Sequence, residues 1–148
     1  MHEISCNLCT KSISGVGGVN IFREKRPRMR ARVSFTPADF NAEHEKSLDF
    51  IKRSVAESTA ERIVVVTHHL PTMAVVAPEH KGNLLNSAFA TELGNYIADS
   101  RIDVWIFGHS HANIDATIGK TRIVCNQLGY VYYRENFAGF DGGKFIEV

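Results

Sequence analysis

Hydrophobic positions recur at helical spacing in "TPADFNAEHEKSLDFIKRSVAES", residues 36–58. The pattern predicts a capped start followed by a helix from about residue 42, in which Leu48, Ile51 and Val55 face a core. His44 comes early in this helix, on its polar side, and is expected to be solvated.

The next segment, "RIVVVTHH" at residues 62–69, is a continuous run of β-branched residues bounded by polar ones. Such a run is typical of a central strand that is buried on both faces. Pro71 then stops any regular continuation. Further along, "IDVWIF" at residues 102–107 predicts a second apolar strand, which ends at Gly108.

Between these strands, residues 83–100 have apolar positions every four residues, which predicts a second amphipathic helix. Its predicted stripe consists of Leu85, Phe89, Leu93 and Ile97.

After Gly108, residues 113–126 predict a hairpin that turns at Gly119 and Lys120, and short strands are expected around 130–133 and 144–148. Residues 1–22 predict a strand, a glycine turn and another strand. The order strand, helix, strand and then a β-rich tail indicates an α/β fold with an antiparallel flank.

The composition is that of an ordinary globular chain, with 148 residues, 44% of them hydrophobic and 22% charged. This length favours one domain over 1–148. The net charge of +1 provides no overall field that would recruit nucleic acid or a membrane. No stretch reaches the roughly 18 apolar residues that span a bilayer, and the N-terminus lacks the pattern of a secretory signal, so a cytoplasmic protein is expected.

Residues 1–40 form an atypical N-terminal segment, which contains two of the three cysteines. "REKRPRMRAR" at 23–32 contains five arginines and a lysine. Without aromatic residues or a recognition motif, it is more typical of a solvated, mobile loop than of a nucleic-acid module. Cys6 and Cys9 form a single CxxC with no second pair, which favours reduced thiols in a strand or loop over a metal site.

Both predicted apolar strands lead into histidines: His68 and His69 after the first, His109 and His111 after the second. Ligands of open α/β sheets bind at the carboxyl ends of the strands, so these side chains converge if the two strands are neighbours. Neutral imidazole is a common ligand of zinc, iron and manganese. An isolated HxH occurs by chance, but two such sites in matching strand contexts indicate metal binding or catalysis, with His68, His109 and His111 preferred over His69.

The ordered motifs "VVVTHHLPT" and "WIFGHSHANIDATIGKTRIVCNQLGY" resemble the C-terminal half of calcineurin-like metallophosphoesterases over residues 43–148. The resemblance implies an αββα sandwich, with a mixed sheet and flanking helices, and two divalent metal ions, Mn, Fe or Zn. It implies that His68 and His109 ligate one ion and His111 the other. His69 would lie beside the site near the substrate phosphate, as a catalytic residue.

The chemistry implied by the resemblance is hydrolysis of a phosphate ester by a metal-bound hydroxide, without a covalent intermediate. By the same resemblance, Cys125 and "NQLGY" are structural, with Gln127 at the position of the family's usual proline. The family's DxH, GDxxD and GNH motifs are absent. The chain is therefore expected to be a partial domain that carries only the C-terminal histidine ligands.

The absence of these motifs puts the activity of the chain alone in question. The expected partners are a phosphate-ester substrate and either a second copy of the chain or a complementary N-terminal half. The alternative hypothesis is a non-catalytic metal-binding or assembly subunit. A nucleic-acid module using residues 23–32 is a third, which salt-sensitive binding would support.

Overall fold

The computed structural model describes residues 2–6, 19–21, 33–135 and 139–148, and the side chains from residue 35 onward. The regular elements of the described residues are strands β1 to β7, helices α1 to α3 and three short 3₁₀ turns. Their bounds are β1 His2–Cys6, β2 Val19–Ile21, β3 Val33–Phe35, α1 Pro37–Glu57, β4 Ile63–Thr67, 3₁₀ Met73–Val75, 3₁₀ Pro78–His80, α2 Asn86–Phe89, α3 Gly94–Asp99, β5 Val104–Ile106, β6 Ile114–Ile118, β7 Thr121–Cys125 and 3₁₀ Val131–Tyr133.

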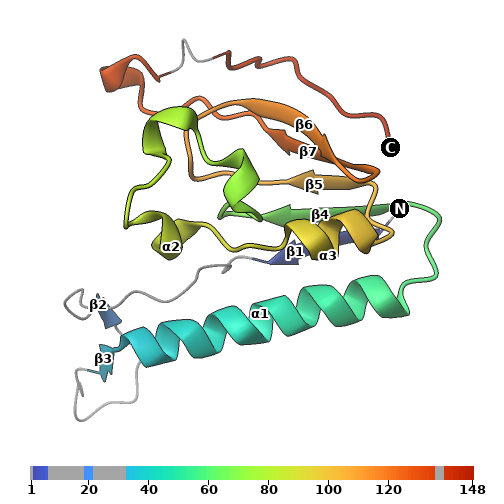
Figure 1. Cartoon of the computed structure of the whole chain (residues 1–148), viewed down its shortest axis with the longest axis horizontal. Coiled ribbons are helices and arrows are strands. Elements are labelled where there is room, and N and C mark those ends of the chain that lie inside the picture. The colour runs from blue at the N-terminus through green and yellow to red at the C-terminus, as the bar shows by residue number, and fades with distance from the viewer. Residues whose placement is uncertain (1, 7–18, 22–32, 136–138) are drawn as a thin grey trace, which may run out of the picture.

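Five of the described strands form one mixed sheet in the order β1-β4-β5-β7-β6. Strands β1, β4, β5 and β7 are parallel, and β6 pairs with β7 in the antiparallel sense. Figure 1 shows these strands side by side, with the long helix α1 beyond β1. Strands β2 and β3 form a separate antiparallel pair. The predicted α/β class, with an antiparallel flank and flanking helices, is confirmed.

The main core lies between the helices and one face of the sheet. Ile51 and Val55 of α1 pack there with Val65 of β4, Trp105 of β5 and Ile123 of β7. Because strand side chains alternate between faces, the intervening positions point to the other side of the sheet. There Val64, Val104 and Val124 form a smaller cluster, against which Ile146 and Val148 of the C-terminal tail pack.

Helix α1 begins at Pro37, five residues before the predicted start. The Thr36 hydroxyl accepts from the Asp39 N–H at 3.2 Å, and the Asp39 carboxylate accepts from the Thr36 N–H at 2.9 Å, a reciprocal capping box. Leu48 is buried as predicted. His44 was wrongly predicted to be solvated: it is 3% exposed, because it precedes Leu48 by four residues on the same stripe.

The single helix predicted over residues 83–100 is wrong: α2 and α3 are separated by a short extended break. Leu70 N–H donates to Phe89 O and Thr91 N–H donates to Leu70 O, both at 3.0 Å, which pairs Ala90 with Leu70. These tertiary bonds take the backbone groups that a continuous helix would use. Of the predicted stripe, Leu93 and Ile97 are buried and Phe89 is partly buried, whereas Leu85 is 61% exposed.

The hairpin predicted over residues 113–126 is confirmed as β6 and β7, with Gly119 at a φ of 59° in the turn. The strands predicted around 130–133 and 144–148 are wrong. Residues 131–133 form a 3₁₀ turn, and residues 144–148 have no regular structure. Their residues find other partners: Lys144 Nζ donates to Asp115 Oδ2 at 2.8 Å, and Ile146 packs on the sheet.

Strands β1 and β2 confirm the two strands predicted within residues 1–22. The predicted glycine turn, Cys9 and the arginine-rich run at 23–32 lie outside the described residues, as does the mobility predicted for that run. Across the part of the chain that is described, no helix combines the length and the apolar character needed to cross a membrane.

Candidate metal centre

The carboxyl ends of β4 and β5 lie next to each other because the two strands are parallel neighbours. The chain leaves β4 into His68 and His69, and leaves β5 through Phe107 and Gly108 into His109. Gly108 N–H donates to His68 O at 2.9 Å, which joins the two loops directly. The structure therefore brings the two predicted histidine pairs to one edge of the sheet.

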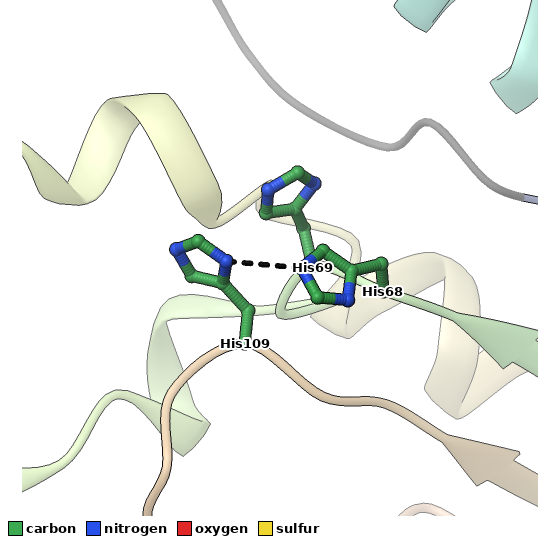
Figure 2. Close-up of side chains that lie close together, drawn as sticks. All are labelled: His68, His69 and His109. Atoms are coloured by element: carbon green, nitrogen blue, oxygen red, sulfur yellow. Dashed lines mark hydrogen bonds between the residues drawn. The ribbon is translucent and has the colours of Figure 1, made fainter. Parts of the chain in front are cut away.

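Three of the four histidines form one group, shown in Figure 2: His68, His69 and His109. His109 Nδ1 and His68 Nε2 are 3.2 Å apart. One ring nitrogen from each of the three residues lies within 4.8 Å of the others. The ring of His69 contacts both neighbours, with centroid distances of 4.8 Å to His68 and 4.6 Å to His109.

The group has the donor chemistry of a metal site and could hold a metal ion. Two nitrogens bound to one tetrahedral zinc ion at about 2.0–2.1 Å lie about 3.4 Å apart. The 3.2 Å between His109 Nδ1 and His68 Nε2 is close to this separation, and one ring nitrogen of each of the three histidines lies within 4.8 Å of the others. His68 is exposed and His69 is half-buried, so an ion can reach the group from solvent.

Electrostatics favour the neutral, ligating form of His109. Burial lowers the pKa of this imidazole, and the nearby His68 and His111 lower it further. Phe89 covers the ring at a centroid distance of 5.1 Å. A ring nitrogen must be deprotonated to bind a metal ion, and this environment favours the neutral form of His109 in which that is possible.

The loop after β5 holds two non-glycine residues in the left-handed region, His109 at a φ of 69° and His111 at 53°. Each such residue costs on the order of 1–3 kcal/mol and persists where its surroundings over-determine it. Such residues are concentrated at functional sites. The hydrogen bond from Ser110 N–H to Gly108 O, at 2.8 Å, accompanies this sharp turn.

His111 lies outside the three-histidine group and has a partner of its own. Its Nδ1 is 2.8 Å from Glu135 Oε2, and its ring stands edge-on to Tyr130 at 4.5 Å. The structure thus groups His68 and His109 with His69, the histidine that sequence reasoning placed beside the site. Glu135 was missed, because no motif links this acidic residue to a histidine 24 positions earlier.

The segment "NQLGY", which follows β7, is joined to the end of the histidine loop by two hydrogen bonds. Asn113 Nδ2 donates to Gln127 O at 3.1 Å, and Gln127 N–H donates to Asn113 Oδ1 at 2.5 Å. A proline at position 127 has no N–H for the second bond. Cys125 is buried, and burial raises the pKa of its thiol, which disfavours the thiolate that metals bind.

Comparisons with known proteins add one relative. No family model matches the chain, and no solved structure matches it. An uncharacterized protein of Acanthamoeba polyphaga mimivirus is 29% identical over 106 residues. The match covers 67% of this chain and 37% of the viral protein, so the chain spans well under half of that relative's length.

Proposed function

We propose that the chain provides the metal-binding histidines of a metal-dependent phosphoesterase. The observation that carries the proposal is the convergence of His68, His69 and His109 at the carboxyl edge of a parallel sheet. The type of reaction comes from the resemblance of residues 43–148 to calcineurin-like metallophosphoesterases.

In this proposal His68 and His109 hold one divalent ion. His69 lies within the same group, where it either adds a third nitrogen ligand or donates to a substrate phosphate oxygen. His111 belongs to a second ion in a complete site. Three imidazoles favour zinc or iron, whereas manganese prefers oxygen ligands.

The contacts within the site favour a neutral His109 in the absence of an ion or a substrate. The close N···N contact between His109 and His68 needs one ring to be neutral, and the half-buried His109 is the ring whose pKa is lowered. Phe89 limits the access of water to one side of His109. A divalent ion bound there supplies Lewis acidity, which lowers the pKa of a coordinated water and offsets negative charge on phosphate oxygens.

We extend the proposal to the complete fold, an αββα sandwich. The sheet face opposite α1 carries the small cluster of Val64, Val104 and Val124, against which the tail residues Ile146 and Val148 pack. A second sheet, from another copy of the chain or from a complementary N-terminal half, would cover this face and remove its contact with water.

A metal and turnover assay tests the function. The purified chain is loaded with Zn²⁺ or Mn²⁺, bound metal is counted by elemental analysis, and hydrolysis of p-nitrophenyl phosphate is followed. Bound metal together with turnover that is lost in His68→Ala/His109→Ala supports the proposal. Turnover that survives the double substitution, or a chain that binds no metal, refutes it.

A non-catalytic metal-binding subunit is the second candidate. The observation that favours it is the composition of the group. As found among the described residues, the group consists of three histidines and includes no carboxylate. Divalent ions in dinuclear sites rely on anionic oxygen to offset their charge. In the same assay, one bound ion per chain without turnover would select this alternative.

A further inference from the structure

His111 and Glu135 form a polar contact outside the three-histidine group. Glu135 Oε2 lies 2.8 Å from His111 Nδ1, and the same oxygen accepts from the Tyr130 N–H at 2.5 Å. Both side chains are partly buried, with 29% of His111 and 33% of Glu135 exposed. A carboxylate has no proton to donate, so His111 Nδ1 carries the hydrogen of this bond.

The backbone of residues 129–135 is shaped to deliver Glu135 to this position. Gly129 has a φ of 67°, and a Cβ there would lie 2.7 Å from Glu135 Cβ and 2.9 Å from Glu135 Oε2. Arg134 adopts a left-handed φ of 62° at the end of the 3₁₀ turn, which reverses the chain. Glu135 N–H then donates to Tyr130 O at 3.3 Å, so backbone and side chain both hold Tyr130.

We propose that Glu135 is a positioning residue: its carboxylate fixes His111 in the Nδ1–H tautomer and leaves Nε2 without a proton, the form that a ligand of the second ion needs in a complete site. The inference rests on the proposed function, in which His111 serves a second ion. Carboxylates that accept from the second nitrogen of a ligating histidine orient the ring and raise its basicity. The edge-on ring of Tyr130 limits rotation of the imidazole from another side.

The tautomer is read directly by ¹⁵N NMR of histidine-labelled protein without metal, near neutral pH. The His111 signals are assigned by their loss in His111→Asn. We expect the wild-type ring to carry its proton on Nδ1. Glu135→Gln, whose amide oxygen still accepts, keeps this tautomer, whereas Glu135→Ala shifts His111 toward Nε2–H. Glu61→Ala, at the opposite end of β4, is the matched control and leaves the signals unchanged.

The tautomer readout decides between the inference and its failure. An Nε2–H tautomer in the wild type, or the same tautomer in Glu135→Ala, overturns the inference. If the wild type binds no zinc, the proposed function fails, while the tautomer readout still decides the action of Glu135.

Discussion

At the scale of residues, His109 is the centre of the candidate metal site. Its ring contacts His68, His69 and Phe89, and it follows the glycine that is hydrogen-bonded to the other histidine loop. Its left-handed φ places a non-glycine residue where the backbone alone would disfavour it. Contacts and strain therefore coincide at the residue that we expect to matter most for metal binding.

His109→Ala removes a ligand and is expected to lower the affinity for the first Zn²⁺ ion by at least tenfold. His80→Ala replaces an exposed histidine in a 3₁₀ turn and is the control, with affinity expected to be unchanged. Isothermal titration measures both. Equal affinities of wild type and His109→Ala would contradict the assignment of His109.

The lowered pKa of His109 predicts a loss of stability in acid. The ordinary value is 6.5, and the folded value lies below it, so the unfolded chain binds more protons in the range between the two. The metal-free protein should therefore lose stability as the pH falls below about 6.5. Urea unfolding at pH 7.5 and pH 5.5 measures this, and His109→Asn should reduce the difference. If the change in unfolding free energy between pH 7.5 and pH 5.5 is the same in the wild type and in His109→Asn, His109 is not the source of the pH dependence.

At the scale of elements, the two apolar strands and their terminal histidines could be predicted because burial on both faces leaves a clear sequence pattern. The break between α2 and α3 could not, because it depends on hydrogen bonds to Leu70, some twenty residues earlier. His44 was misjudged although its spacing from Leu48 was helical. The polar character of an imidazole outweighed its position in that prediction.

The hairpin between β6 and β7 depends on Gly119. A Cβ at this position would lie 2.7 Å from Ala98 O, in a backbone conformation with a φ of 59°. Gly119→Ala is expected to destabilise the fold by about 2–3 kcal/mol, from the left-handed backbone together with the clash.

Gly82→Ala is the matched control for this substitution. Gly82 has a φ of 81°, but a Cβ there would meet no heavy atom within 4 Å, so only the backbone cost of about 1 kcal/mol is expected. Urea unfolding compares the two variants. Equal losses of stability would show that the clash with Ala98 of α3 does not add to the cost of Gly119→Ala.

At the scale of the whole molecule, the helices cover one face of the sheet and leave a small cluster on the other. The α/β class and the flanking helices could be predicted from the sequence, since apolar strands need cover. The sequence could not predict the approach of Glu135 to His111, because the approach needs a glycine at 129 and a left-handed residue at 134 acting together.

Trp105 reports on the integrity of the main core. It is fully buried in β5, and its indole N–H donates to Thr67 Oγ1 at 3.0 Å. Because it is the single tryptophan of the chain, its fluorescence reports only this position. We expect quenching by acrylamide to stay weak until urea unfolds the protein. Strong quenching of the native protein would contradict the buried position of β5.

In the proposed site, imidazoles from the ends of β4 and β5 hold one metal ion. X-ray absorption spectroscopy of the chain loaded with one equivalent of Zn²⁺ tests it most directly. We expect the scattering pattern of two or three imidazole rings, with Zn–N distances of about 2.0–2.1 Å, and fewer rings in His68→Ala and in His109→Ala. A first shell of oxygen alone, or of sulfur at about 2.3 Å from cysteines, would contradict it.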